Sequence, residues 1–340
     1  MSVLHLALSE KSYDITVERG ALARAAGLMK LDRRALILTD QGVPARYATA
    51  VAAACREPHV VTLPAGEANK CMDRYQELLR IMVEAGFDRG DCVVAVGGGV
   101  MGDLAGFAAA TYMRGIDFYN VPTTLLAQVD SSIGGKVAVD FAGYKNIIGA
   151  FYQPRAVLID PEVLSTLDPR QYACGMAEAV KMFACCDAEM FDELERREDC
   201  PVDEVILRAL NIKKTVVEQD EKEKGLRRVL NFGHTVGHAI ESLSAEGTSP
   251  LLHGECVGIG MLCMSAPPVR ARIAALLRRF SLPVSWEGET AGLQEAILHD
   301  KKASGDRIHI IKVEEIGHFT EEAVLAADIV RRSREVITLR

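Results

Sequence analysis

The sequence predicts two domains of different class: an α/β domain with a Rossmann-like parallel sheet over residues 1–160, and an all-α domain over residues 161–340. Strand-like and helix-like patterns alternate through the first half of the chain, as they do where helices cover a parallel sheet. Helical periodicity dominates residues 170–282, where strand-like patterns nearly vanish. A length of 340 residues suits two such domains. We therefore place the boundary near residues 155–170.

The expected elements of the first domain follow in chain order. Strands are expected at residues 3–8, 13–17, 35–40, 59–63 and 92–96, and helices at 44–55, 72–85 and 104–112. Pro44 suits the first turn of its helix, because proline at that position loses no hydrogen bond. In the second domain, only residues 308–313 have a strand-like pattern.

The composition indicates a globular protein and limits the classes of partner that it could bind. Hydrophobic residues make up 49% of the chain and charged residues 25%, and the net charge is −8. A negative net charge disfavours nonspecific nucleic-acid binding but leaves room for a local cluster of cations that binds a small anion. Nine cysteines without a C-x-x-C spacing indicate free thiols in a reducing compartment. With no signal-peptide pattern and no apolar run of membrane-spanning length, we expect a cytoplasmic protein without a nucleic-acid or membrane partner.

A glycine-rich stretch follows the strand expected at residues 92–96. Gly97, Gly99 and Gly102 match the pattern G-x-G-x-x-G and precede an expected helix, so backbone N–H groups there could bind a pyrophosphate. A tight strand-to-helix turn explains the glycines equally well. The motif also follows several strands instead of the first, which is not the ordinary Rossmann order. Asp40 and Glu67, which end or follow earlier strands, could hold ribose hydroxyls.

A run of small, polar and basic residues follows in the sequence. Ser131-Ser132-Ile133-Gly134-Gly135-Lys136 combines hydroxyls, exposed N–H groups and a lysine, a composition suited to oxyanions. Arg114 and Lys145 lie on either side of it. The alternative is a solvated loop whose lysine only aids solubility, and the clustering of cations favours the anion site.

Three histidines and a glutamate indicate a metal site in the second domain. His234 and His238 are four residues apart and lie on one face of a helix, and His253 follows in Leu252-His253-Gly254-Glu255. With Glu178 upstream, they offer the imidazole and carboxylate ligands of a catalytic zinc site that keeps one position for substrate. The alternatives are a structural histidine pair and a surface ion pair between Glu178 and Lys181.

Several of these stretches together resemble the 3-dehydroquinate synthase family, over most of residues 35–260. They are residues 97–151, 178–181, 223–227, 231–241 and 252–255. The resemblance implies a lyase of the shikimate pathway, which leads to chorismate and the aromatic amino acids. Such an enzyme converts 3-deoxy-D-arabino-heptulosonate 7-phosphate, a phosphorylated keto acid, into 3-dehydroquinate and phosphate. It uses NAD catalytically with zinc or cobalt. A homodimer is also implied, with the active site in a cleft between a nucleotide-binding domain and a metal- and substrate-binding domain.

The resemblance also implies a role for individual residues. The metal ligands are Glu178, His234 and His253, which moves His238 from the metal to the phosphate. The residues implied to bind NAD are Asp40, Glu67, Lys70, Gly99, Val100, Met101, Gly102, Asp103, Thr123, Thr124, Lys136, Lys145, Val163, Leu164, Ser165 and Thr166. Those implied to contact substrate include Lys136, Asn146 and Lys181. Lys213 and Arg227 are implied to bind the substrate carboxylate, with Glu223 beside them, and Arg114 is implied to reach the phosphate across the dimer. Lys301 is also implied to contact substrate, with Lys302 as a competing alignment.

The sequence departs from the family pattern at two places. Val137 stands where the family usually has threonine, which removes one hydroxyl next to the anion-binding run. Residues 264–269 are shorter than the corresponding helical segment, and Pro267 and Pro268 are expected to break a helix there. We therefore expect altered packing over residues 265–290.

Three other functions fit part of the pattern. A metal-dependent polyol dehydrogenase would share the glycine run but would consume NAD and would not need Lys136, Lys213 and Arg227 together. Another sugar phosphate cyclase, acting on glucose 6-phosphate, would have no substrate carboxylate for Arg227 to bind. A regulatory protein that binds NAD without catalysis would not need the three metal ligands.

Overall fold

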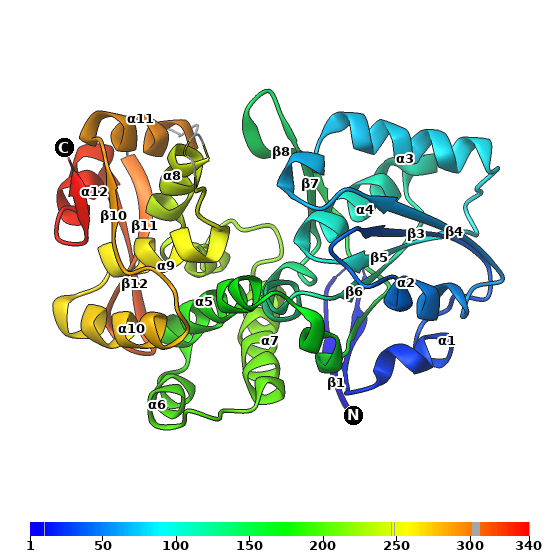
Figure 1. Ribbon diagram of the computed structural model, residues 1–340, viewed down its shortest axis with the longest axis horizontal. Coiled ribbons are helices and arrows are strands. Elements are labelled where there is room, and N and C mark those ends of the chain that lie inside the picture. Colours follow the sequence, from blue (N-terminus) through cyan, green and yellow to red (C-terminus); the bar gives the residue numbers. More distant parts are fainter. Residues whose placement is uncertain (10, 246, 248, 301–306, 340) are drawn as a thin grey trace. The chain divides into compact units, whose positions relative to one another are not determined.

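The computed structural model describes residues 1–9, 11–245, 247, 249–300 and 307–339, and it divides into two compact units, Met1–Leu167 and Asp168–Arg340 (Figure 1). The sequence placed the boundary at residue 160. The turn Pro161–Thr166 belongs to the first unit because Asp160, its N-cap, is bonded within that unit. The Asp160 carboxylate accepts the backbone N–H groups of Gly20 and Leu22, both at 3.0 Å.

The first unit is built on a seven-stranded sheet in the order β1-β2-β9-β6-β5-β3-β4. All neighbours pair in parallel except β1 and β2. The strands are β1 (Ser2–Leu6), β2 (Tyr13–Val17), β3 (Arg34–Asp40), β4 (Glu57–Leu63), β5 (Cys92–Gly97), β6 (Asp117–Pro122) and β9 (Ala156–Ile159). The parallel, Rossmann-like sheet expected from the sequence is therefore confirmed.

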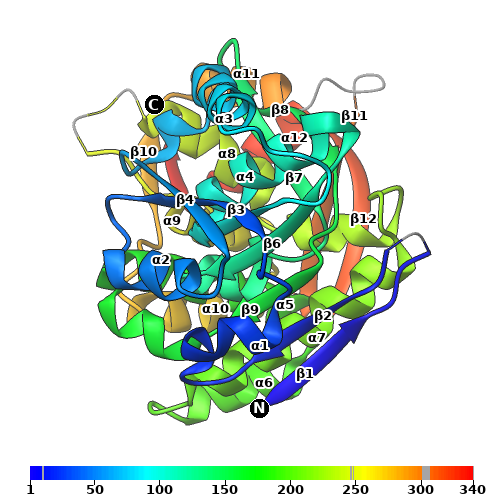
Figure 2. The ribbon, with the colours of Figure 1, turned by 90° about the vertical axis from the view of Figure 1, so that its right-hand side faces the viewer.

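Helices cover both faces of this sheet (Figures 1 and 2). They are α1 (Ala25–Leu28), α2 (Ala45–Ala52), α3 (Met72–Glu84) and α4 (Gly99–Thr111). A hydrophobic core lies on each face of the sheet, and alternate residues of β3 point into one or the other. Leu36 and Leu38 pack with α3 and α4, whereas Ala35 and Ile37 pack with α2. A strand buried on both faces has a continuous apolar run, which is why β3 and β5 could be recognised from the sequence.

The carboxyl ends of β3 and β5 meet where the strand order reverses. The chain passes from β3 to β4 on one side and then to β5 on the other side of β3. Ligands of open α/β sheets bind at such a switch point. Asp40 ends β3 and Gly97 ends β5, so the two candidate nucleotide-binding segments lie at this point.

In the first unit, one expected helix begins earlier than predicted, and one hairpin was not predicted. The helix expected at residues 104–112 begins at Gly99, because Gly98 acts as its N-cap and the glycine motif supplies its first turn. The low helix propensity of glycine had hidden that turn. Residues 136–151, for which the sequence predicted no element, form an antiparallel hairpin of β7 (Lys136–Phe141) and β8 (Tyr144–Phe151).

The second unit is organised around α5 (Pro169–Cys186), in which every residue from 173 to 185 is buried. Its other helices are α6 (Ala188–Arg196), α7 (Val202–Gln219), α8 (His234–Ser244), α9 (His253–Cys263), α10 (Pro267–Arg279), α11 (Thr290–Asp300) and α12 (Ala326–Ser333). α5 packs against α6, α7, α9 and α10, and α8 packs against α9 and α11. A helical second unit is thus confirmed.

The description all-α needs a correction, because the second unit also contains two small sheets. β11 (Arg307–Glu315) pairs with β12 (His318–Leu325), and β10 (Trp286–Gly288) pairs in parallel with β13 (Ile337–Leu339). The expected strand at residues 308–313 lies in β11. Its partner β12 was missed because it is largely exposed and carries adjacent glutamates, Glu321 and Glu322, which obscure the alternating pattern.

The two prolines of the shortened segment begin a helix instead of breaking one. Pro267 and Pro268 occupy the first two positions of α10, where a missing N–H removes no helical hydrogen bond. α9 has already ended at Cys263, and Ser265 pairs with Val313 in the connection. The expectation of a disrupted helix at this point was therefore wrong. In the part of the chain that the structure describes, no helix has the length and apolar character needed to cross a membrane.

Candidate active site

A buried carboxylate faces two imidazoles in the second unit. The Glu178 side chain is 1% exposed, and its Oε1 lies 3.4 Å from Nε2 of His253 and 3.8 Å from Nε2 of His234. Its Oε2 lies 2.5 Å from Nζ of Lys181, which is also 1% exposed. Oε1 forms no hydrogen bond within the described ranges. The ion pair with Lys181 therefore exists, but it is buried, not the surface pair that spacing alone would allow.

Glycines bring the helices that carry these side chains close together. A Cβ added to Gly260 on α9 would lie 1.9 Å from the carbonyl oxygen of Gly233, the residue before His234. A Cβ on Gly254, the residue after His253, would lie 2.5 Å from Cα of Cys174 on α5. These contacts are backbone to backbone, so no side chain could move to make room. The convergence of Glu178, His234 and His253 depends on them.

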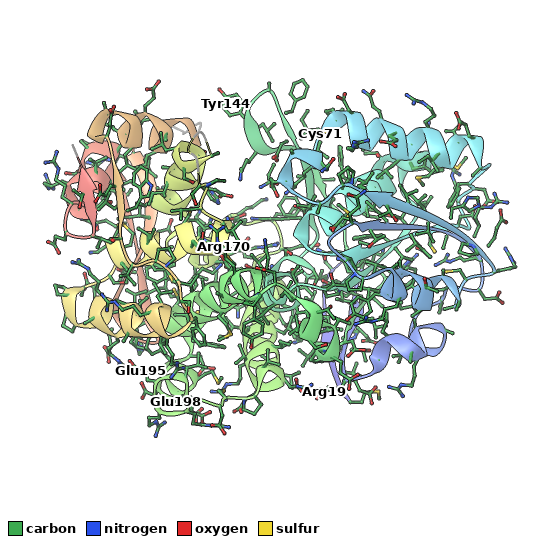
Figure 3. All side chains as sticks on the ribbon, viewed as in Figure 1. Arg19, Cys71, Tyr144, Arg170, Glu195 and Glu198 are labelled. Carbon is green, nitrogen blue, oxygen red and sulfur yellow. The ribbon has the colours of Figure 1, made fainter. Side chains whose placement is uncertain are left out.

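An ion pair also ties the start of α5 to the start of α9. Arg170 donates from Nε and Nη2 to the two carboxylate oxygens of Glu255, both at 2.7 Å (Arg170 is labelled in Figure 3). Glu255 Oε2 also accepts the backbone N–H of Leu252 at 2.7 Å. A two-point contact of this kind fixes direction as well as distance. It therefore holds the helix that carries Glu178 against the helix that carries His253.

The geometry fits a zinc-like ion. Nδ1 of His234 lies 3.1 Å from the carbonyl oxygen of Phe232, and Nδ1 of His253 lies 3.2 Å from Oε2 of Glu241. A proton on each Nδ1 satisfies these acceptors and leaves each Nε2 lone pair directed toward Glu178. A tetrahedral ion with ligand bonds of about 2.0–2.2 Å separates its ligand atoms by roughly 3.3–3.6 Å. The spacings around Oε1 of Glu178 are close to that range.

His238 is part of the same cluster. Its ligand atoms lie within 4.8 Å of those of His234 and His253, so three imidazoles form a second possible ligand set. Its ring centroid lies 5.2 Å from that of His234 and 5.7 Å from that of His253. The buried, unbonded oxygen of Glu178 favours Glu178 as the third ligand, because a buried carboxylate oxygen needs a positive or hydrogen-bonding neighbour.

The ionisation of the cluster follows from its charges. Burial alone would raise the pKa of Glu178, but the Lys181 ammonium and the adjacent His253 hold it far below its usual range. Burial and the positive charge of Lys181 lower the pKa of His234 well below its usual value. Burial opposes protonation of His253 too, yet the carboxylates of Glu178 and Glu241 raise its pKa to about 10.

Two of the cations that the resemblance implies for substrate binding are buried in the second unit. The structure buries Arg227, which is 2% exposed, and Lys213, which is 5% exposed. Asp220 shapes the loop that holds Arg227, because its carboxylate accepts the backbone N–H groups of Lys224, Gly225 and Arg227 at 2.7–3.0 Å. The planar donor pair of an arginine matches the geometry of a carboxylate.

Glu223 lies in the same loop in a strained backbone conformation. Its φ of 55° is in the left-handed region, which a residue with a side chain rarely adopts. Asn231 donates to Oε1 of Glu223 at 2.7 Å and so fixes the direction of the carboxylate. Strain of this kind is retained where surrounding contacts require it, and it is found at functional sites.

In the first unit, the buried Lys70 contacts three other predicted site residues. Lys70 is 5% exposed, and its Nζ lies 2.5 Å from Asp103 Oδ2 and 3.9 Å from Glu67 Oε1. It also donates to Oδ1 of Asn146, which has a left-handed φ of 54°. Burial alone would lower the pKa of Lys70, but the charges of Asp103 and Glu67 raise it. Residues distant in sequence thus form one charged cluster.

Other predicted residues surround the glycine turn at the end of β5. Thr123 N–H donates to the carbonyl oxygen of Gly97 at 2.9 Å, and a Cβ on Gly98 would lie 3.0 Å from Cγ2 of Thr124. A Cβ on Gly97 would lie 3.7 Å from Oδ2 of Asp40, whose pKa is raised by burial. The first turn of α4 leaves the N–H groups of residues 99–101 without helical partners, whereas the N–H of Gly102 donates to the carbonyl oxygen of Gly98 at 3.1 Å. The turn therefore suits a phosphate group bound next to Asp40.

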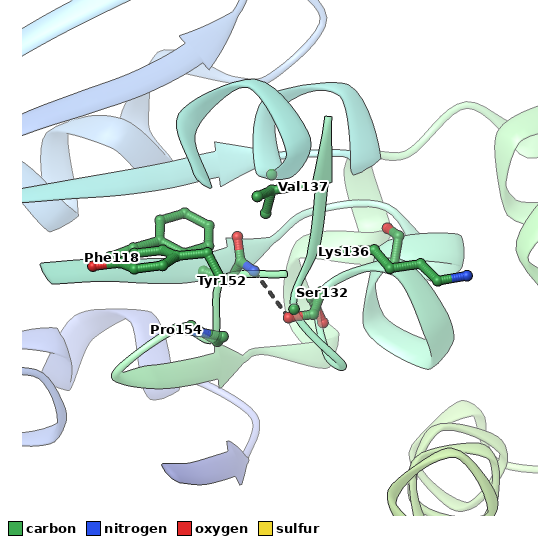
Figure 4. A pocket seen from close by; sticks show the side chains of 10 residues that line it. Phe118, Ser132, Lys136, Val137, Tyr152 and Pro154 are labelled. Atoms are coloured by element: carbon green, nitrogen blue, oxygen red, sulfur yellow. Dashed lines mark hydrogen bonds between the residues drawn. The ribbon is translucent and has the colours of Figure 1, made fainter. Parts of the chain in front are cut away.

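The remaining predicted residues of the first unit lie elsewhere. Lys136 and Lys145 are exposed on the β7–β8 hairpin, and Figure 4 shows the Lys136 side chain extending away from a small cavity lined by Phe118 and Tyr152. Arg114 is exposed and has a left-handed φ of 70°. In the turn Pro161–Thr166, Val163 and Leu164 are buried, whereas Ser165 and Thr166 bond to Glu162 and Tyr47. Lys301 and Lys302 lie outside the described residues.

Val137 belongs to the apolar core, not to the polar cluster. It is 4% exposed and packs with α4, where a Cβ on Gly106 would lie 2.3 Å from its Cγ1. The departure from the family's threonine therefore replaces a hydroxyl by a methyl group in an apolar environment. Such a change suits its surroundings and does not remove a group from the Lys70 cluster.

Three residues of the site had no role in the sequence analysis. Glu241 and Asn231 lie within the quoted histidine stretch, and Asp220 precedes the Glu223 stretch. Glu241 could have been found, because it lies seven residues after His234 and three after His238 and so shares their helix face. Asp220 and Asn231 act on a loop whose shape no local pattern reveals.

Replacing Lys181 by methionine is expected to lower the free energy of unfolding by about 3–5 kcal/mol in metal-free protein, because Glu178 would be left as an uncompensated buried charge. A bound divalent ion restores a positive charge, so the loss should shrink when zinc is present. Urea unfolding with EDTA and with excess zinc measures both values. As the control, Lys214→Met removes a half-exposed partner of Glu218 and should cost about 0.5 kcal/mol or less. Equal losses with and without zinc would contradict a cation beside Glu178.

Comparison with known proteins shows that most of the chain matches one enzyme family. Residues 60–174 match the profile described as 3-dehydroquinate synthase N-terminal, and residues 175–303 match the profile described as 3-dehydroquinate synthase C-terminal. The 3-dehydroquinate synthase of Pelobacter propionicus is 44% identical over 337 residues, which cover 92% of this chain and 93% of the relative.

Two solved sugar phosphate cyclases have the same architecture. A 2-epi-5-epi-valiolone synthase from Streptomyces hygroscopicus, solved with NAD+ and Zn2+, superimposes with a TM-score of 0.85 at 29% identity, over 97% of each chain. A 2-deoxy-scyllo-inosose synthase, solved with carbaglucose-6-phosphate, NAD+ and Co2+, gives a TM-score of 0.85 at 24% identity, over 98% of this chain and 100% of that one, and so shares the fold. Because the two profiles together span residues 60–303 and a curated relative matches nearly the whole chain, this protein belongs to the 3-dehydroquinate synthase family.

Proposed function

We propose that this enzyme converts 3-deoxy-D-arabino-heptulosonate 7-phosphate into 3-dehydroquinate and inorganic phosphate, with NAD and a divalent zinc or cobalt ion as cofactors. It is a carbon–oxygen lyase of the shikimate pathway. The observation that carries the proposal is the buried oxygen of Glu178 facing His234 and His253, in a chain of the 3-dehydroquinate synthase family.

Phosphate leaves slowly from an unactivated carbon, and the reaction needs the neighbouring C–H to become acidic. When bound, NAD would supply reversible hydride transfer at the adjacent alcohol, and a divalent ion would supply polarisation of that alcohol's oxygen. Glu178, His234 and His253 would hold the ion and leave a position for substrate oxygens. Asp40, Thr123, Thr124 and the first turn of α4 would hold NAD at the switch point.

His238 is placed to move a proton during the reaction. It lies beside the two imidazoles that would hold the ion, on the same face of α8 as His234. An imidazole can accept a proton from an adjacent oxygen or donate one to it. We assign His238 to the phosphate end of the substrate, where Lys136, Lys181 and Arg114 of a second protomer would neutralise charge and Asn146 would donate a hydrogen bond. This requires the homodimer that the family resemblance implies.

The other end of the substrate carries a carboxylate. Arg227 has the planar donor pair that matches it, with Lys213 as a second cation and Glu223 beside them. Fixing the carboxylate also holds the open chain in a folded form after phosphate has left. Ring closure then depends mainly on orientation, because both reacting carbons belong to one molecule. We further propose that the enzyme works in the cytoplasm.

The reaction is tested by incubating the purified protein with the seven-carbon phosphate substrate, NAD and zinc. Phosphate release without net NADH is the expected result, because the cofactor is reoxidised in each turnover. Net accumulation of NADH would indicate a polyol dehydrogenase instead. Turnover of glucose 6-phosphate and not of the keto acid phosphate would indicate another sugar phosphate cyclase.

A further inference from the structure

The two imidazoles that face Glu178 differ in what holds their other nitrogen. Nδ1 of His234 lies next to a backbone carbonyl, that of Phe232, at 3.1 Å. Nδ1 of His253 lies next to a carboxylate, that of Glu241, at 3.2 Å. One ring is therefore oriented by a neutral group and the other by a charged one.

Glu241 reaches His253 from a different helix. It lies on α8, seven residues after His234, so the two side chains are on the same face of that helix two turns apart. His253 begins α9, and the Glu241 side chain is only 14% exposed. The contact thus fixes the direction of the His253 ring relative to the helix that carries His234.

We infer that Glu241 is a positioning residue that sets the metal affinity of the Glu178–His234–His253 cluster through His253. A carboxylate on Nδ1 keeps the proton there, so that the Nε2 lone pair remains available, and it increases the electron density of the ring. The Phe232 carbonyl fixes the tautomer of His234 but adds no charge. His253 is therefore the stronger donor of the two imidazoles.

Glu241 also changes the net charge around the ion. Binding of the ion displaces the proton of His253, so the imidazoles count as neutral. The carboxylates of Glu178 and Glu241 then supply two negative charges and Lys181 supplies one positive charge, which gives a net charge of −1 around a divalent cation. Without the Glu241 charge, the same groups sum to zero. Both effects act in one direction, toward tighter binding of the ion.

The test uses the full-length protein stripped of metal and the affinity for Zn2+ measured by competition with a chromophoric chelator. Glu241→Gln keeps an acceptor but removes the charge, and Glu241→Ala removes both. We expect about a 10- to 100-fold loss of Zn2+ affinity for the glutamine variant and a larger loss for the alanine variant. The visible absorption of bound Co2+ should show fourfold coordination retained in Glu241→Gln, since the three ligands remain.

Glu204→Gln is the matched control. It removes the same charge from the first turn of α7, where Glu204 pairs with the exposed Arg197 at 3.4 Å, and it should leave Zn2+ affinity unchanged. Equal affinity of Glu241→Gln and the parent protein, with both folded, would overturn the inference. The inference rests on the proposed metal site and not on the reaction: a parent protein that binds no Zn2+ contradicts the site itself, whereas a different substrate leaves the affinity comparison intact.

Discussion

Gly260→Ala is expected to lower the free energy of unfolding by about 3 kcal/mol or more, at the upper end of the range for overpacking. Its Cβ would lie 1.9 Å from the carbonyl oxygen of Gly233 and 3.0 Å from the backbone nitrogen of Gly237. Relief requires α8 to move away from α9, and His234 follows Gly233 directly. We therefore expect the variant to lose Zn2+ binding as well as stability.

Gly258→Ala on the same helix provides the control for Gly260→Ala. The nearest atom to its added Cβ is Cδ2 of Leu277 at 3.3 Å, the end of a side chain that can shift slightly. It should cost less than about 1.5 kcal/mol and keep the metal site. Urea unfolding measures the stability of both variants, and Zn2+ titration measures their metal binding. Similar stability of the two would show that the α8–α9 contact tolerates separation.

Arg227→Ala is expected to reduce kcat/KM by about a hundredfold or more while leaving the affinity for NAD unchanged. Each charge-assisted hydrogen bond to the substrate carboxylate contributes about 1.5–3 kcal/mol, and 1.4 kcal/mol corresponds to a factor of ten. Arg227→Lys keeps the charge but loses the planar pair of donors, so it should recover only part of the activity.

Arg228→Ala is the control for Arg227, because the adjacent side chain is 35% exposed and pairs with Glu321 at 2.7 Å. It should leave kcat/KM within a few fold. Arg227 also donates to the carbonyl oxygen of Glu221 at 2.5 Å, so unfolding curves must show that the alanine variant is folded. Unchanged kinetics in folded Arg227→Ala would remove this residue from substrate binding.

The fold of the first unit was largely accessible from the sequence. β3 and β5 have apolar runs that can be buried on both faces, and the glycines that follow β5 mark the turn at its end. These patterns depend on neighbouring residues only. The β7–β8 hairpin was missed for the same reason, because Lys136 pairs with Phe151 through contacts that are not local.

The sequence by itself determined the kinds of groups in the second unit: imidazoles one helical turn apart on α8, another at the start of α9, and an acid and a lysine one turn apart on α5. Only the tertiary structure decided that Glu178 is buried and faces both His234 and His253, and that Glu241 holds the second imidazole. Helical periodicity is set by adjacent residues. The distance between two helices is set by packing, and here by glycine contacts between segments far apart in the chain.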